Sequence, residues 1–297
     1  MRAVDLARLV ALAAIWGASF LFMRVAVGPL GAIPTAESRL LLAGATIALY
    51  LWIVGKRLAL ARHWRYFAIV GTLNSAAPFA LYAWSAQSLP ASYLAVINAT
   101  APLFGALVAA LWLGERITPR AALGLAAGIA GVTTLVGLGP IAATPITVVA
   151  AAAGLAASLC YAIASGYVKR RSYDVDPSAL AGGSNVAAAA VLLPFAFAAP
   201  PPGLPAPEAA WAALALGVLC TGIAYLLYFR LITDVGPSRA LTVTFLIPVF
   251  GMLWGAVFLG ETITATLLAG CALVLAGTGM IVGPARATPG QRSPARQ

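Results

Sequence analysis

Long apolar runs recur along the whole chain of 297 residues, and they restrict its fold more than any other feature. A run of about 18 apolar residues or more spans the hydrocarbon core of a bilayer as a helix. Only 9% of the residues are charged, against about a quarter in soluble proteins. The runs are rich in leucine and alanine and lack the alternation of a membrane β-barrel. We therefore predict an all-α membrane protein with ten transmembrane helices.

Glycine and proline residues, such as those of Gly28-Pro29 and Pro90, separate the ten predicted spans. The predicted spans are residues 6–27, 34–54, 65–88, 91–113, 119–138, 146–168, 178–199, 209–232, 237–259 and 264–283. The stretch after them is rich in Arg, Pro and Ser, which predicts a disordered tail over 284–297.

The basic residues predict the orientation of the chain. If the N-terminus is cytoplasmic, 16 of the 18 Lys and Arg residues lie on the cytoplasmic side, and the other two, Arg24 and Arg39, lie within spans. This distribution satisfies the positive-inside rule, and it explains the net charge of +10 without nucleic acid as a partner. We predict a multi-pass protein of a bacterial inner membrane with both termini in the cytoplasm.

An internal repeat appears at an offset of 146 residues. Residues 102–118 align with residues 248–264 without a gap, and ten of these 17 positions are identical. The second copy begins after five spans, an odd number, so it must insert upside down. We predict two inverted five-helix repeats, 1–138 and 146–283. Inverted repeats are typical of secondary transporters, in which the substrate binds between the halves near the midplane of the membrane.

Four sequence features together resemble one known family. They are the sequence Ile-Trp-Gly-Ala-Ser-Phe at 15–20, Arg39, and the two Leu-Gly-Glu motifs that end at Glu115 and Glu261. They resemble EamA-type members of the drug/metabolite transporter superfamily. The resemblance implies export of amino acids and related metabolites, including aromatic amino acids, through a central cavity lined mainly by spans 1, 3, 4, 6, 8 and 9. The second copy departs from the pattern where Tyr161 and its neighbours replace the tryptophan of the first.

Polar side chains, aromatic side chains and prolines within the spans are candidates for lining that cavity, since polar groups inside a membrane usually face a cavity or a partner. The alternatives are interhelical hydrogen bonds, an interfacial aromatic belt and static helix bends. The candidates are Trp16, Asn74, Pro78, Tyr82, Asn98, Pro102, Tyr161, Tyr225, Tyr228, Thr244 and Pro248.

The charged residues near the ends of spans 1 and 2 allow two functional interpretations. Arg24, Glu37 and Arg39 are candidates for an outer gate, with an ion pair between Glu37 and an arginine as the alternative.

The acids of the two Leu-Gly-Glu motifs are read as structural caps. Glu115 and Glu261 each precede, by three residues, a threonine that can cap the next helix, Thr118 or Thr264.

The sequence predicts no cofactor and no metal site. Cys160, Cys220 and Cys271 lie inside apolar runs without CxxC spacing, so we interpret them as core residues. The single histidine and the absence of HExxH and GxSxG motifs argue against a membrane enzyme. No charge ring or carbonyl filter motif favours a channel.

The functional prediction is therefore a transporter, not an enzyme, that exports small metabolites or facilitates their movement by alternating access. Amino acids, including aromatic ones, are the predicted substrates, and another neutral or cationic metabolite or drug is the alternative. No carboxylate is predicted at the midplane, so we expect a neutral or zwitterionic substrate and gradient-driven movement. The predicted partners are a small-molecule substrate and the lipid bilayer, with the chain acting as a monomer.

Overall fold

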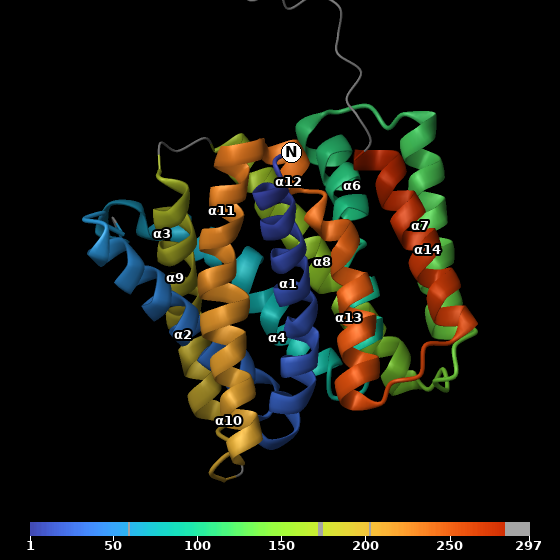
Figure 1. Cartoon of the computed structure of the whole chain (residues 1–297), viewed down its shortest axis with the longest axis horizontal. Helices are drawn as coiled ribbons and strands as arrows, with labels where there is room; N and C mark the ends of the chain where they lie inside the picture. The colour runs from blue at the N-terminus through green and yellow to red at the C-terminus, as the bar shows by residue number, and fades with distance from the viewer. Residues whose placement is uncertain (59, 172–174, 202, 283–297) are drawn as a thin grey trace, which may run out of the picture.

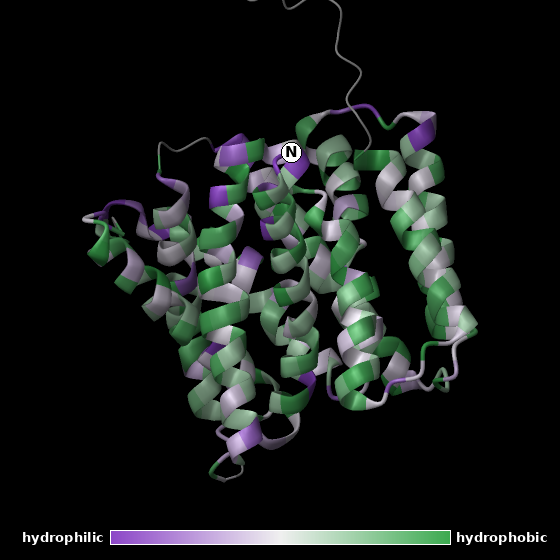
Figure 2. Cartoon of the chain, in the orientation of Figure 1, coloured by the Kyte–Doolittle hydropathy of each residue, from purple (hydrophilic) through white to green (hydrophobic). Residues whose placement is uncertain are grey.

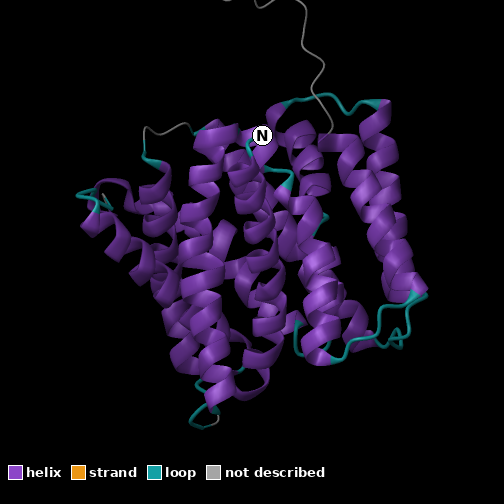
Figure 3. Cartoon of the chain, in the orientation of Figure 1, coloured by secondary structure: helices purple, strands orange, loops and turns teal. Residues whose placement is uncertain are grey.

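The computed structural model describes residues 1–58, 60–171, 175–201 and 203–282, and it contains only helices and loops in those ranges (Figure 3). The helices, in chain order, are α1 (Ala3–Leu30), α2 (Ala32–Ile53), α3 (Leu60–Gly71), η1 (Thr72–Ala76), α4 (Ala77–Ser85), α5 (Ala91–Asn98), α6 (Ala101–Leu113), α7 (Pro119–Gly137), α8 (Pro145–Arg170), α9 (Pro177–Ala198), α10 (Pro207–Leu214), η2 (Ala215–Ile223), α11 (Ala224–Val235), α12 (Pro237–Ala240), α13 (Val243–Leu259) and α14 (Ala265–Val282).

Nine helical stretches in the described ranges are long and apolar enough to cross a membrane, and α13 is a shorter apolar helix of 17 residues. Three of the nine are composite: Leu60–Ser85 joins α3, η1 and α4, Ala91–Leu113 joins α5 and α6, and Pro207–Val235 joins α10, η2 and α11. The predicted all-α membrane fold is confirmed in this form. Gly283 and the predicted tail 284–297 lie outside the described residues.

Hydrophilic residues concentrate at the two ends of the helix bundle, most strongly at the end where α1 begins (Figure 2). The helix α14 ends at that same end (Figure 1). Arg2, Arg8 and Arg230 lie within 4.0 Å of Asp234 there. We call this end of the bundle the basic end and the opposite end the far end.

The sequence repeat recurs in local structure. The π-helical segment Thr72–Ala76 corresponds, at the offset of 146, to residues 218–222, which lie within the π-helical segment η2. Each π-helical turn places one extra residue in a helix and so changes the direction of the side chains that follow it.

The ends of the repeated Leu-Gly-Glu motifs also match. Gly114 and Gly260 end their helices with φ values of 72° and 65°, the left-handed conformation that glycine adopts without strain. Four residues after these glycines, Thr118 and Thr264 each accept a 3.2 Å hydrogen bond from the backbone N–H of the residue three positions later.

Glycines allow α7 and α14 to pack closely side by side (Figure 1). A methyl group at Gly124 would lie 2.6 Å from the carbonyl oxygen of Gly277, and one at Gly131 would lie 2.7 Å from that of Gly270. Because membrane helices gain stability from backbone approach and not from expelling water, small residues at such contacts are favoured.

Candidate functional site

A central cavity of about 440 Å³ lies between the helices and is the best candidate for a functional site. Its walls come from α1, α2, η1, α4, α5, α6, α8, η2, α11, α13 and the turn before α13, with one contribution from the end of α14. The volume falls within the range of roughly 300–1,000 Å³ that small-molecule sites occupy.

Nine of the eleven predicted cavity residues line this space. They are Trp16, Asn74, Tyr82, Asn98, Pro102, Tyr161, Tyr225, Tyr228 and Thr244. The other two, Pro78 and Pro248, are buried away from it, in the first turn of α4 and inside α13. Their position agrees with the alternative interpretation, a bend required by packing.

Aromatic rings form much of the cavity wall. Tyr82 and Tyr161 stack with ring centroids 6.4 Å apart, and Trp16 contacts Tyr228 with centroids 5.2 Å apart. The hydroxyl groups of Tyr82 and Ser158 are hydrogen-bonded at 2.8 Å, which fixes the Tyr82 ring in a fully buried position. The wall is therefore a rigid aromatic surface that suits an apolar or aromatic side chain.

Amide and hydroxyl groups supply the polar part of the wall. Asn74 Nδ2 donates to the Tyr225 hydroxyl at 3.1 Å. Thr244 donates its hydroxyl to the carbonyl of Leu241. The side chain of Asn98 has no hydrogen-bond partner among the described residues, so both its donor and its acceptor remain available to a bound solute.

Arg39 also lines the cavity, although the sequence placed it among the gate candidates. Its side chain is 7% exposed, its Nε donates to Thr221 Oγ1 at 2.8 Å, and its guanidinium carbon lies 3.7 Å from the centroid of the Phe79 ring. The other gate candidates lie elsewhere. Arg24 donates to the carbonyl oxygens of Ala86 and Gln87 at the far end.

Among the residues that the structure describes, Glu37 forms no ion pair with an arginine, so the alternative to an outer gate is wrong. Both carboxylate oxygens of Glu37 are buried and have no hydrogen-bond partner among the described residues. Residues 37 and 39 are about 200° apart around a helix, so Glu37 points away from the side of α2 that carries Arg39.

The two predicted cap glutamates have different partners. Glu261 accepts backbone hydrogen bonds from Ala91 at 2.7 Å and Ser92 at 3.0 Å, at the N-terminus of α5. Glu115 instead pairs with Lys169 at 2.7 Å in an exposed position. Neither carboxylate caps the helix that follows it in sequence, since Thr118 and Thr264 do so.

The sequence did not mark Ser19, Phe20, Met23, Phe79 or Ile247 as cavity residues, although they also line the cavity. These residue types occur throughout membrane helices, so only the tertiary packing distinguishes them.

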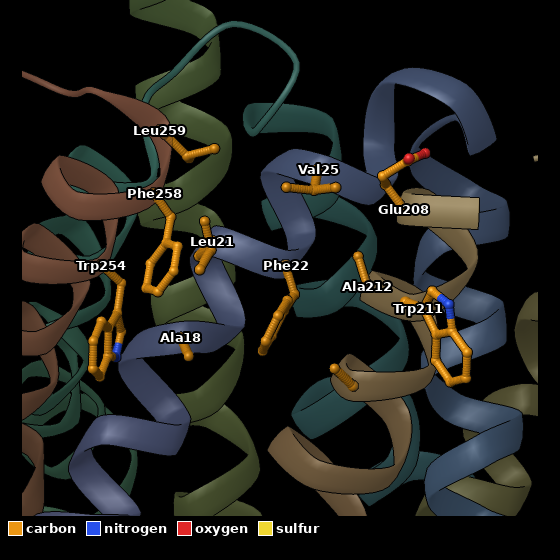
Figure 4. Close-up of a pocket in the computed structure, with 11 residues that line it drawn as sticks. Ala18, Leu21, Phe22, Val25, Glu208, Trp211, Ala212, Trp254, Phe258 and Leu259 are labelled. Atoms are coloured by element: carbon orange, nitrogen blue, oxygen red, sulfur yellow. The ribbon is translucent and has the colours of Figure 1, made fainter. Parts of the chain in front are cut away.

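A second and larger space, of about 690 Å³, is a groove on the outside of the bundle between α1, α10 and α13 (Figure 4). Trp211 and Phe258, at its edges, are 70% and 65% exposed. Its lining is almost wholly apolar, with Glu208 as the one charged member of the set. Such a groove suits lipid chains and offers few groups to orient a polar solute, so we favour the central cavity.

No group of three or more His, Cys, Asp or Glu residues in the described part of the chain could hold a metal ion. Cys160, Cys220 and Cys271 are free thiols, of which the last two are buried.

Apolar spans packed around an internal, solute-sized cavity define a multi-pass membrane protein of the transporter class. Comparison with known proteins gives the family. The model of the EamA-like transporter family matches residues 6–137 and again residues 148–283. The chain belongs to the EamA-like transporter family, as the sequence features predicted, and it is a transporter and not an enzyme.

Curated relatives match most of the chain at low identity. The uncharacterized transporter YoaV of Bacillus subtilis (strain 168) is 23% identical over 266 residues, 89% of this chain and 91% of the relative. The uncharacterized inner membrane transporter YedA of Escherichia coli (strain K12) is 29% identical over 260 residues, 86% and 83% of the two chains.

One relative has a name that specifies a substrate. A probable terminal-alkyne amino-acid exporter of Streptantibioticus cattleyicolor is 28% identical over 286 residues, 93% of this chain and 95% of the relative. A solved crystal structure superposes with a TM-score of 0.64 at 22% identity and covers 94% of this chain and 96% of its own. That likeness supports the fold alone.

Proposed function

We propose that the chain exports small zwitterionic metabolites, above all amino acids including aromatic ones, by alternating access through the central cavity. The observation that carries this proposal is the wall itself, which combines stacked aromatic rings with amide and guanidinium groups in about 440 Å³. The name of the Streptantibioticus cattleyicolor relative supports the same substrate class.

Alternating access requires two halves in opposite orientations, and the packing of α7 against α14 supports that arrangement. At the offset of 146, Gly124 of α7 is equivalent to Gly270 of α14, and Gly131 is equivalent to Gly277. The contacts are crossed: Gly124 approaches Gly277, and Gly131 approaches Gly270. Equivalent helices therefore run antiparallel, and the contact is reciprocal in the manner of a two-fold axis. We propose that the repeats 1–138 and 146–283 are inverted copies.

Loop charge supports an orientation with the basic end in the cytoplasm of the inner membrane. The cationic side chains of Arg2, Arg8 and Arg230 lie at that end, around Asp234. The printed name of YedA, an inner membrane transporter, supports the same membrane. Both termini would then be cytoplasmic, and we propose that the chain acts as a monomer.

The two equivalent segments that flank the cavity differ in burial. Residues 91–97 of α5, at the far end, are all buried. In the equivalent segment 237–243, at the basic end, Pro237, Arg239, Leu241 and Thr242 are exposed. This asymmetry supports a conformation that is closed at the far end and open toward the cytoplasm.

Counterflow in proteoliposomes tests the proposed function. Purified protein is reconstituted with unlabelled solute inside, and uptake of labelled amino acids, sugars and nucleotides is followed. We expect saturable, transient accumulation of amino acids, with aromatic ones among the preferred substrates. Uptake without saturation would indicate a channel, and the absence of counterflow for every solute would refute the proposal.

Energy coupling is tested in the same vesicles. Glu37 is the one acid that lies more than a turn inside a described span, and it does not line the cavity. We therefore propose facilitated movement without proton exchange. An imposed pH gradient should not drive uphill transport, and Glu37→Gln should transport as the wild type does. Uphill transport that Glu37→Gln abolishes would contradict this.

A further inference from the structure

We propose that the guanidinium group of Arg39 binds a carboxylate of the transported solute, which makes the substrate a monocarboxylate such as an amino acid in its zwitterionic form. This inference rests on the proposed function and extends it, because it assigns a substrate group to a specific side chain.

Arg39 is held rigidly against the cavity. Thr221 donates its hydroxyl hydrogen to the carbonyl of Leu216 at 2.9 Å, so its oxygen is free to accept from Arg39 Nε at 2.8 Å. The Phe79 ring lies against the guanidinium at 3.7 Å. Both contacts use the Nε edge or the face of the guanidinium, and they leave its two terminal nitrogens for other acceptors.

Close packing of α2 on the π-helical segment η2 fixes the backbone of Arg39. A methyl group at Gly217 would lie 3.0 Å from the carbonyl oxygen of Arg39, and one at Gly222 would lie 2.7 Å from Thr46 Cβ. Because these glycines bring the two helices together, Thr221 reaches Arg39. The guanidinium is therefore preorganised, which reduces the entropy lost when a ligand binds.

No protein carboxylate neutralises this charge. Among the described residues none lies within 4.0 Å of Arg39, and its terminal nitrogens have no hydrogen-bond acceptor. The described acids have other partners or lie elsewhere. Asp5 and Asp234 pair with Arg2 and Arg8, Asp176 with Lys56, Glu115 with Lys169, and Glu261 with the N-terminus of α5. Glu208 lines the outer groove between α1, α10 and α13, and Glu37 points away from Arg39.

A charge at membrane depth is expensive unless it is paired. Arg24, the other arginine within a span, meets this requirement with two backbone carbonyls. Arg39 instead faces a cavity that has no acidic side chain among its described lining residues. A carboxylate on the solute would complete the pair, with two parallel hydrogen bonds from the guanidinium.

The surrounding groups narrow the class of solute further. Arg39 is the one charged residue in the lining, so the cavity suits a single negative charge and not the two charges of a phosphate ester. A cationic solute without a carboxylate would meet only repulsion. The aromatic wall at Tyr82 and Tyr161 would hold an apolar side chain, and the free amide oxygen of Asn98 could accept from an ammonium group.

The test compares L-phenylalanine with its amide, which keeps the ring and the ammonium group but lacks the carboxylate. Affinities are measured from competition in counterflow for the wild type, Arg39→Gln, Arg39→Lys and the control Arg24→Gln. We expect the wild type to prefer the acid on the order of 10- to 100-fold. Arg39→Gln should lose this preference through weaker acid binding, Arg39→Lys should keep part of it, and Arg24→Gln should keep all of it.

Equal affinity of the wild type for the acid and the amide would overturn the inference whatever the variants do. An undiminished preference in folded Arg39→Gln would also overturn it. If Arg39→Gln does not fold, the inference is tested with Arg39→Lys, which keeps the positive charge and must therefore still prefer the acid over the amide. Loss of this preference in Arg39→Lys would then overturn the inference. Absence of counterflow by the wild type with every solute would instead refute the proposed function, so the two failures are distinguishable.

Discussion

The contact of Glu261 with the N-terminus of α5 makes a specific prediction about closure of the far end. Its carboxylate joins the end of α13, in the second repeat, to the start of α5, in the first. The equivalent acid, Glu115, makes no such contact and pairs with Lys169 in an exposed position. Replacement of Glu261 by alanine should therefore destabilise the far-end-closed conformation relative to the open one.

The size of the effect follows from the two hydrogen bonds. Each hydrogen bond to a charged group contributes about 1.5–3 kcal/mol, and the field of the helix N-terminus adds to them. Glu261 would regain water in the open conformation, so we expect a net shift of about 2–3 kcal/mol. The population open at the far end should then rise roughly 30- to 150-fold.

The assay is the labelling rate of a single cysteine from the outside of intact cells. Leu89, two residues before the Ala91 N–H group that Glu261 binds, is fully buried. The native Cys160, Cys220 and Cys271 are first replaced by alanine, and Leu89→Cys is introduced. A membrane-impermeant maleimide should label this cysteine much faster when Glu261→Ala is added.

Glu115→Ala is the matched control, since that carboxylate lies at the opposite end of the bundle. It should not increase labelling at position 89. An unchanged labelling rate in Glu261→Ala, with an unaltered thermal unfolding profile, would refute the reasoning that this contact holds the far end closed.

Three further predictions concern stability, measured by thermal unfolding of the purified protein in detergent. Gly131→Ala should destabilise the protein by about 1–3 kcal/mol through overpacking against Gly270. The control Gly137→Ala should not, because the space around Gly137 is open. Equal destabilisation by the two variants would contradict the contact between α7 and α14. Tyr82→Phe should cost about 1 kcal/mol by removing the hydrogen bond to Ser158; no change would contradict that bond. Asp176→Ala should cost about 1 kcal/mol, because the carboxylate accepts from the backbone N–H groups of Ser178 and Ala179. The hydrogen bond from the Lys56 ammonium, and after it those from the two N–H groups, lower the pKa of Asp176 in the folded protein. The stability that Asp176 contributes is therefore fully present above the ordinary aspartate pKa of about 3.9 and is lost as the pH falls through the lowered pKa of the folded protein. A stability difference between wild type and Asp176→Ala that persists below that lowered pKa would contradict this.

Much of the fold could be predicted from the sequence because length and hydropathy decide where a chain can cross a bilayer. The repeat at an offset of 146 residues anticipated matching caps at Thr118 and Thr264. The π-helical segments η1 and η2 could not be predicted, since no proline or charge in Thr72–Ala76 or Ala215–Ile223 marks them. They depend on how the helices pack.

The candidate site was predictable to the extent that its residues are unusual in a membrane. Asn74, Asn98 and Tyr161 are such residues, and the structure brings them to one cavity. Phe79 and Ile247 carry no such signal. The ion pair expected at Glu37 was wrong for a simple reason: residues two apart on a helix point in nearly opposite directions.

The central claim is that one cavity between two inverted repeats opens to one face of the membrane at a time. The direct measurement is labelling of Thr244→Cys, in the wall of the cavity, after the native Cys160, Cys220 and Cys271 have been replaced by alanine. It is carried out in right-side-out and inside-out vesicles. We expect the cysteine to be labelled rapidly from the cytoplasmic face and more slowly from the other face, because only one face is open at a time. L-phenylalanine should protect it from labelling from both faces. Simultaneous rapid labelling from both faces, or reactivity that no solute alters, would contradict it.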